Sequence, residues 1–153
     1  MKVTEVMTAA PRTCTPDTTV AEAANLMWET DCGVLPVVDD SELVGIVTDR
    51  DLFIAVGTRN TRAAHLRVGA VMTTKVATCA LGDEVEAALA TMRQARVRRL
   101  PVVDVDRKLI GILSLNDIVL AAGESGSVKD RDVVAALQGI CAHPPRDTDQ
   151  AAA

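Results

Sequence analysis

The sequence predicts an α+β fold built from two tandem helix-strand-strand-helix repeats that pack with pseudo-two-fold symmetry. The first observation is a duplicated stretch, LVGIVTDRDL at 43–52 and LIGILSLNDI at 109–118. The second is that VMT, TC and LPVVD each recur after a constant 65 residues. The third is composition, because 48% of the 153 residues are hydrophobic but only Trp28 and Phe53 are aromatic. Such a core suits aliphatic helices packed on small sheets.

Each repeat opens with a predicted amphipathic helix. Apolar residues stand at i, i+3, i+4 and i+7 over 20–27 and again over 85–92, which is typical of a helix with one buried face. Thr19 with Glu22, and Asp83 with Glu86, have the spacing of a capping box. We therefore expect both helices to begin at these boxes.

A strand pair and a second helix follow in each repeat. In the first copy the apolar runs 34–38 and 43–47 are separated by DDSE and predict a hairpin. Pro36 has no amide hydrogen, so its strand should be an edge or irregular there. The second helix is expected to run from about residue 49 and to stop at Gly57, as its copy stops at Gly123. The second hairpin loop is one residue longer than the first.

These elements divide the chain into two domains and a C-terminal extension. The expected boundaries are 7–64 and 72–127 for the repeats, 128–142 for one further helix, and 143–153 for a disordered tail. Each repeat has roughly 55 residues, which is small for a stable independent core. The two halves should therefore cover each other and leave two related clefts, where ligands would sit.

Bulk properties exclude some classes of protein. The net charge of −5 and the pI near 5.0 argue against a nucleic-acid partner. The absence of a long apolar run and of a signal-peptide centre argues against a membrane partner and predicts a cytoplasmic protein. In that reducing compartment the four cysteines should be free thiols. Two alternatives remain open: a Cys14–Cys32 redox pair, and half of a metal site at Cys141 and His143.

Catalytic signatures are absent from the sequence. The two histidines fall in the expected linker and tail, no GxxxxGK[ST] phosphate loop occurs, and no Ser or Cys lies in a nucleophile elbow. The chain is therefore not expected to be an enzyme, and no resident cofactor or metal is expected. Binding remains as the expected activity.

The repeated pattern h-h-P-V-V-D followed by G-h-h-[ST]-x-x-D resembles the CBS domain pair, also called a Bateman module. The resemblance covers roughly residues 6 to 124. The small stand-alone architecture with a short extra C-terminal helix is also similar to hypoxic response proteins. The resemblance implies a disc-like regulatory module that binds adenosyl ligands in its clefts.

The resemblance also implies which residues bind. Asp51 and Asp117 match the acid that accepts both ribose hydroxyls, and Thr48 and Ser114 match the hydroxyl beside the ribose and phosphate at a helix start. The residues that match the walls around the adenine are Thr13, Cys14, Thr15, Thr78, Val34, Leu35, Pro36, Leu100 and Pro101. The arginines that are candidates for phosphate contacts are Arg50, Arg98 and Arg99.

Other interpretations of these residues stay open. Thr48 with Asp51, and Ser114 with Asp117, are also spaced as helix caps with a purely stabilising role. The RVRR cluster at 96–99 is equally compatible with a solvated helix end. The second copy has Leu-Asn at 115–116 where the first has Asp-Arg at 49–50, so the two clefts should differ.

The expected function is a regulatory, ligand-sensing module that reports energy or stress state in signal transduction. The ligand would be an adenine nucleotide or a related adenosyl compound, and the sequence does not choose among AMP, ADP, ATP, S-adenosylmethionine and NAD. The rival hypothesis is a structural or protein-interaction homodimer without a ligand. In either case a homodimer is expected, since symmetric dimers are the commonest oligomers, with an unknown downstream protein as a further partner.

Overall fold

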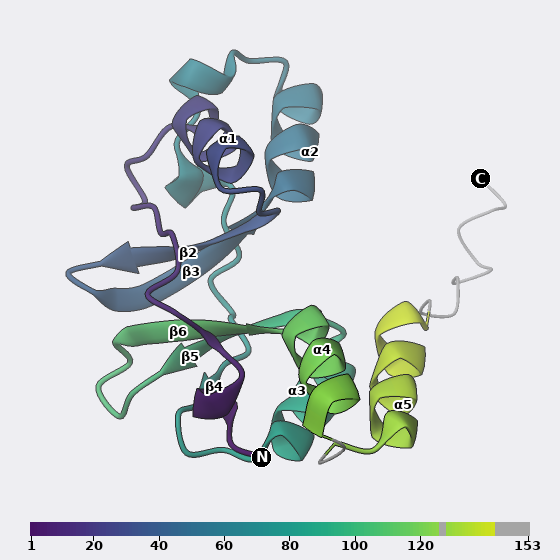
Figure 1. Ribbon diagram of the computed structural model, residues 1–153. Helices are drawn as coiled ribbons and strands as arrows, with labels where there is room; N and C mark the ends of the chain where they lie inside the picture. The colour runs from purple at the N-terminus through teal and green to yellow at the C-terminus, as the bar shows by residue number, and fades with distance from the viewer. Residues whose placement is uncertain (126–127, 143–153) are drawn as a thin grey trace, which may run out of the picture.

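Two β-hairpins, one from each repeat, lie one above the other in the middle of the molecule, and each repeat carries its helices on the outer side (Figure 1). The computed structural model describes residues 1–125 and 128–142. The predicted tail at 143–153 lies outside these residues. The order helix, strand, strand, helix occurs twice, and the α+β fold with tandem repeats is confirmed.

The two long helices and the two hairpin strands of each repeat have counterparts in the other repeat. The short segments include one further strand ahead of each first helix and 3-10 turns in the linking segments. The elements of the first repeat are α1 (Val20–Glu29), β2 (Val34–Asp39), β3 (Glu42–Thr48) and α2 (Asp49–Arg59). Those of the second repeat are α3 (Val85–Ala95), β5 (Arg99–Val103), β6 (Leu109–Ser114) and α4 (Leu115–Ser125). The short segments are η1 (Val3–Glu5), β1 (Thr8–Ala9), η2 (Ala63–His65), η3 (Val68–Ala70) and β4 (Cys79–Ala80).

The segment that precedes each repeat belongs structurally to the other repeat. Strand β1 pairs antiparallel with β6, with Thr8 opposite Ile112. At the symmetric place Thr73 pairs with Ile46 through two backbone hydrogen bonds of 3.0 and 2.9 Å. The cores follow the same exchange, because the buried side chain of η1 lies in the second repeat's core and that of η3 lies in the first repeat's core. The two halves are thus interlocked by their leading segments.

The two hairpin loops also meet each other. Leu43 N donates to the Arg107 carbonyl at 3.0 Å, and Leu109 N donates to the Ser41 carbonyl at 3.2 Å. Arg107 lies in the longer second loop and has a positive φ of 61°. The extra residue of the second copy therefore lies where the two hairpin ends join.

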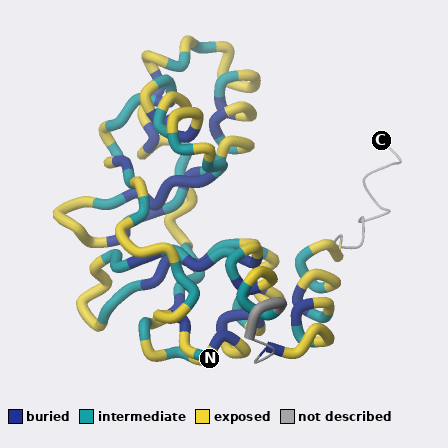
Figure 2. Tube along the Cα trace, viewed as in Figure 1, coloured by how far each residue is buried: buried dark blue, intermediate teal, exposed yellow. Residues whose placement is uncertain are grey.

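Two separate hydrophobic cores flank the hairpins, as the buried residues in Figure 2 show. The largest fully buried side chains are aliphatic, among them Leu35, Leu43, Met92 and Leu100. Strands β2 and β5 carry a register shift at the same place, one residue beyond the proline. The irregularity expected near Pro36 is therefore present in both copies.

The extra helix α5 (Asp130–Cys141) packs mainly on α3. Its inner face contributes Val133 and Ala136 to the core of the second repeat. Among the described residues, no helix has the length and apolar character needed to cross a membrane.

Three expected helix ends differ from the structure. Helix α2 continues through Gly57 to Arg59 and ends at Asn60, which takes the left-handed conformation with φ 47°. Its counterpart α4 continues past Gly123 to Ser125. Glycine has a low helix propensity but does not by itself end a helix. The capping box predicted at Asp83 is also wrong: Glu84 is the N-cap of α3, and the Asp83 carboxylate accepts from Ala80 N at 2.8 Å.

Candidate functional site

The duplicated motif forms a capping box in both repeats. Thr48 N and Thr48 Oγ1 donate to Asp51 Oδ2 at 2.9 and 2.7 Å, and Asp51 N donates back to Thr48 Oγ1 at 3.2 Å. Ser114 and Asp117 make the same three bonds at 2.9, 2.7 and 3.1 Å. The box fixes each acid at the start of a helix and uses one of its two carboxylate oxygens. A second acceptor oxygen is therefore not consumed by the box.

A cavity of about 410 Å³ lies beside the second of these boxes. This volume is in the range of small-molecule sites in proteins. Both repeats contribute to its walls, together with the chain segment that follows β1. The lining residues are Thr8, Ala10, Pro11, Arg12, Thr30, Asp31, Cys32, Val34, Pro36, Arg99, Ile112, Ser114 and Asp117.

The fold explains how each group of lining residues reaches this cavity. Strand β1 crosses to β6, which brings the following residues, including Arg12, to the cavity. Val34 and Pro36 come from β2, and Arg99 begins β5 opposite Ser114. The start of α4 is held in place by a 2.9 Å bond from Leu115 N to the Arg98 carbonyl. The cavity is therefore formed only when the two repeats are assembled.

The chemistry of the cavity is mixed. Proline and aliphatic side chains can enclose a flat apolar ring, while the Ser114 hydroxyl and the Asp117 carboxylate can bond a diol. Arg12 and Arg99 supply guanidinium groups, which bind phosphate oxygens in bidentate fashion. Asp31 adds a second acid to the lining. This set suits a nucleoside that carries an anionic group.

The structure brings only some of the predicted binding residues to this cavity. Val34, Pro36, Arg99, Ser114 and Asp117 line it. Thr48 and Asp51 form the equivalent box of the first repeat, at the pseudo-symmetric position beside the Ile46–Thr73 pairing. The others lie elsewhere: Cys14, Leu35, Leu100 and Pro101 are buried, Thr13 is half-buried, Thr15 is exposed and bonded to Thr18, Thr78 lines a different cavity, and Arg50 and Arg98 are exposed.

Sequence reasoning missed the residues that reach the cavity from outside the duplicated motif. Arg12 belongs to the segment after the first VMT motif, and Thr30, Asp31 and Cys32 form the loop after α1. The repeated VMT motif was the available signal, because a segment preserved in both copies must serve a shared structural role. Its crossing to the other repeat places Arg12 at the site.

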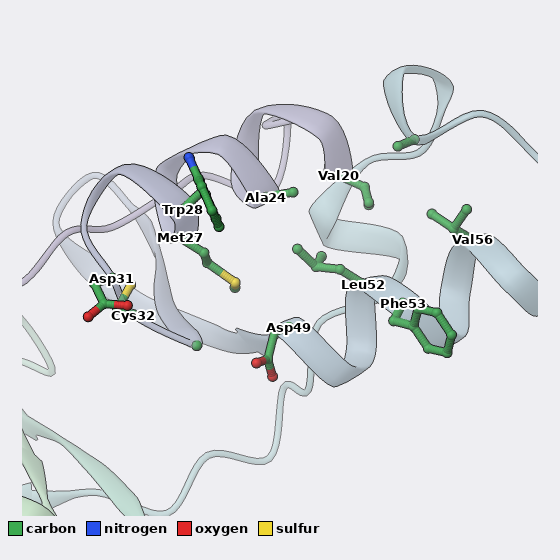
Figure 3. A pocket seen from close by; sticks show the side chains of 12 residues that line it. Val20, Ala24, Met27, Trp28, Asp31, Cys32, Asp49, Leu52, Phe53 and Val56 are labelled. Carbon is green, nitrogen blue, oxygen red and sulfur yellow. The ribbon is translucent and has the colours of Figure 1, made fainter.

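A second cavity, of about 590 Å³, lies between α1 and α2 on the outside of the first repeat. Figure 3 shows α1, with Met27 and Trp28, opposite α2, with Leu52 and Phe53. We call it the α1–α2 groove; its lining residues are Val20, Ala24, Met27, Trp28, Asp31, Cys32, Gly33, Asp49, Leu52, Phe53, Val56 and Ala63. Asp31 and Cys32 line both this groove and the cavity beside Asp117. One loop is therefore a common wall of the two.

The four cysteines are free thiols in the structure. Burial raises the pKa of the Cys14 thiol to about 11, and burial, with the nearby Asp83 charge as a smaller cause, raises the pKa of Cys79 to about 12. Cys32 is half-buried and its thiol lies 3.3 Å from the Val34 carbonyl. His143 lies outside the described residues, and within them no three potential metal ligands gather at one place.

Two interlocked repeats with a nucleoside-sized cavity at their junction define a tandem-repeat binding module. The chain belongs to the CBS domain family, whose model matches residues 3–57 and again 68–124. The CBS domain-containing protein YhcV of Bacillus subtilis is 36% identical over 118 residues, covering 77% of this chain and 83% of that protein. Inosine-5'-monophosphate dehydrogenase of Mycobacterium leprae is 36% identical over 139 residues. The matched region covers 88% of this chain but only 25% of that enzyme.

Solved structures of CBS domain pairs have the same fold. The CBS domain pair of protein MJ0100, in complex with 5'-methylthioadenosine and S-adenosyl-L-methionine, superposes with a TM-score of 0.74 at 26% identity, covering 81% of this chain and 97% of that chain. CBSX2 in complex with AMP gives 0.72 at 34% identity, covering 80% and 96%. Hypoxic Response Protein I with two coordinated zinc ions gives 0.72 at 27% identity, covering 78% and 98%. The resemblance inferred from the repeated motifs is confirmed.

Proposed function

We propose that this protein is a regulatory, non-catalytic module that binds an adenine nucleotide or a related adenosyl compound in the cavity beside Ser114 and Asp117. The observation that carries the proposal is the lining itself: apolar walls, a hydroxyl with a carboxylate, and two arginines meet in one cavity of about 410 Å³. Two solved relatives support it, one in complex with AMP and one with adenosyl compounds.

Among adenosyl ligands, those with a phosphate should bind best. Arg12 and Arg99 favour a negative group, and the positive end of the α4 dipole acts in the same direction. S-adenosylmethionine carries a positive sulfonium centre, which the two guanidinium groups repel. The Asp31 carboxylate in the lining disfavours an anionic ligand. The Asp117 carboxylate accepts hydrogen bonds from its capping box, and in the complex it would also accept them from the ribose.

Occupancy of the cavity would be transmitted as a shift between packing arrangements. The loop with Asp31 and Cys32 is the route, because it also lines the α1–α2 groove. We propose that a ligand held against this loop changes the groove, and through it a homodimer or a downstream protein that responds to energy or stress state.

A thermal-shift panel tests the binding. AMP, ADP, ATP, NAD and S-adenosylmethionine would be compared with adenosine, the uncharged matched control. A ligand at 100 times its Kd adds about 2.7 kcal/mol to the free energy of unfolding. We expect AMP to raise the melting temperature more than adenosine does. If no compound in the panel raised the melting temperature, the proposal would be contradicted.

Calorimetric titration of two matched variants then assigns the site. Asp117→Asn keeps an acceptor for the capping box but removes the charge that a diol would use. Loss of a charged hydrogen bond costs roughly 1.5 to 3 kcal/mol, so affinity should fall at least tenfold. Asp51→Asn changes the identical box of the other repeat and serves as the control. Unchanged affinity in both would reduce the acids to helix caps.

A second candidate function, a protein-interaction homodimer without a ligand, is favoured by one observation. Trp28 and Phe53, the two aromatic residues of the chain, are exposed on the α1–α2 groove. If the panel shows no ligand while light scattering shows a dimer, this candidate replaces the first.

A further inference from the structure

Asp31 is an acid in the lining of the cavity beside Asp117 that the fold itself does not use. Among the described residues, the Asp31 carboxylate takes part in no ion pair and accepts no hydrogen bond. The residue is exposed, and it lies on the wall that the cavity shares with the α1–α2 groove. The reason for a negative charge at this place is therefore to be sought in the cavity.

The backbone at position 31 does not require an acid either. Asp31 follows the end of α1 in the left-handed conformation, with φ 49°, and the next residue donates its amide to the Met27 carbonyl at 3.0 Å. Glycine and asparagine are the usual residues at such a helix end. The end of α3 is built identically, with Arg96 at φ 55° and the next amide donating to the Met92 carbonyl at 3.0 Å. Two equivalent helix ends thus carry opposite charges.

The cations of the cavity are sufficient for one phosphate. Arg12 and Arg99 line it, and neither takes part in an ion pair within the part of the chain that the structure describes. A phosphate monoester carries about 1.5 to 2 negative charges at neutral pH, which two guanidinium groups balance. Each further phosphate adds negative charge, and the described lining residues include no third cation.

Carboxylates lie where the cavity adjoins the α1–α2 groove. Asp31 is on the common wall, and a Cβ atom at Gly33 would lie 2.9 Å from Asp49 Oδ2, so a second carboxylate is two residues away. Figure 3 shows Asp31 and Asp49 at the same end of the groove. An anionic chain that extends past the common wall meets both. Repulsion between like charges is stronger in such a partly enclosed site than in bulk water.

We propose that Asp31 restricts the cavity beside Asp117 to ligands with a single phosphate, so that AMP binds and ADP and ATP are disfavoured. Asp31 is then a specificity-determining residue, which acts through charge repulsion and not through contact with the nucleoside. This inference rests on the proposed function and names the ligand class of the same cavity.

Calorimetric titration with AMP and ATP tests the proposal. Divalent cations are left out, because they would neutralise the polyphosphate. Asp31→Asn removes the charge and keeps a residue that adopts the left-handed conformation readily, and Asp31→Arg copies the residue at the equivalent position of the second repeat. Asp40→Asn is the matched control: Asp40 is exposed, has φ 45° in the first hairpin loop, and lines neither the cavity nor the groove.

The ratio of the two affinities is the quantity that decides. The unmodified protein should bind AMP more tightly than ATP. Asp31→Asn should reduce this preference by about fivefold or more, the effect of removing one unit charge near the ligand, and Asp31→Arg should reduce it further. Asp40→Asn should leave both affinities unchanged. In the unmodified protein the preference should also decrease as salt is raised, because Asp31 is exposed and its charge is screened.

Three outcomes overturn the inference while nucleotide binding stands. They are tighter binding of ATP than of AMP by the unmodified protein, a ratio that neither substitution of Asp31 changes, and weaker binding of AMP by Asp31→Asn, which would mean that the carboxylate contacts the ligand. Circular dichroism verifies that the variants are folded, and the salt series needs no variant. If neither nucleotide nor adenosine binds, the proposed function itself fails, and this inference fails with it.

Discussion

Met72 occupies the space that a side chain at Gly45 would need. A Cβ atom at position 45 would lie 2.6 Å from Met72 Sδ and 3.2 Å from the Thr73 carbonyl oxygen. In the other repeat a Cβ at Gly111 would lie 2.7 Å from Met7 Sδ and 2.9 Å from the Thr8 carbonyl oxygen. The glycine of each duplicated motif is therefore paired with the VMT segment that crosses from the other repeat.

Gly111→Ala should destabilise the protein by about 1 to 3 kcal/mol, because the added methyl group meets backbone that is held in the β1–β6 pairing. Urea denaturation measures the change. Gly57→Ala is the matched control, since a Cβ there meets nothing within 4 Å and the position is inside α2. It should stabilise by about 0.5 to 1 kcal/mol. Equal effects of the two substitutions would contradict the crossing contact.

Thr48→Ala and Ser114→Ala should each lower the free energy of unfolding by about 1 kcal/mol without ligand, because each removes the hydroxyl of an otherwise identical capping box. Denaturation of the two variants side by side measures this. Similar losses are expected, since the two capping boxes make the same three hydrogen bonds. A loss at only one of them would show that the other box is not formed in solution.

Val3→Ala and Val68→Ala should each cost about 2 kcal/mol, since each side chain is fully buried in the core of the opposite repeat. Thermal unfolding should remain a single transition in both variants, because the leading segment of each repeat still completes the core of the other, so the halves unfold together. Val105→Ala, at an exposed position, should change stability by less than about 0.5 kcal/mol. Two separate transitions would mean that the repeats fold independently.

In the native protein at pH 8, Cys32 and Cys141 should react with a thiol reagent much faster than Cys14 and Cys79. The latter two are buried, and burial raises the pKa of both, so the reactive thiolate is scarce. A stopped-flow trace should have two fast and two slow equivalents, and denaturant should expose four. Fewer than four after purification under reducing conditions would instead indicate a disulfide.

The same thiols predict a loss of stability in alkali. The folded pKa values of Cys14 and Cys79, about 11 and about 12, exceed the value of 9.0 for an unburied thiol. The unfolded chain therefore deprotonates first, and the contribution of each buried thiol is complete below pH 9 and is lost as the pH rises above it. The slope is about 1.4 kcal/mol per pH unit for each thiol. Urea denaturation at pH 8 and 10 should give a smaller difference for Cys79→Ala than for the unmodified protein.

Local sequence patterns were sufficient to predict the repeats, the element order and the capping boxes at Thr19, Thr48 and Ser114. The 3.6-residue period of a helix, the two-residue period of a strand and the spacing of a capping box are properties of short segments. The duplication provided two copies of each pattern. The end of α2 was misjudged because Gly57 can continue a helix, whereas the left-handed residue that ends it is Asn60.

The composition of the cavity was less predictable, because it depends on contacts between distant segments. Arg12 reaches the cavity only through the crossing of β1 to β6; the repeated VMT motif marks the segment that crosses but does not indicate the strand with which it pairs. Conversely, Cys14 and Leu35 were expected at the ligand but are buried in the core of the first repeat. Residues adjacent in a motif alternate between cavity and core along a strand, so proximity in sequence did not decide which of them line the cavity.

The exchange of leading segments also has a consequence for the order in which the protein can fold and for its ancestry. During synthesis, residues 3–9 are made about a hundred residues before their partners in β6, so the core that contains Val3 is completed only with the second repeat, whereas the core of the first repeat lies within residues 14–72. A single ancestral repeat would carry both the crossing segment and the strand that receives it. Two copies of such a short chain could exchange segments as separate molecules, and joining their genes would make that partnership permanent.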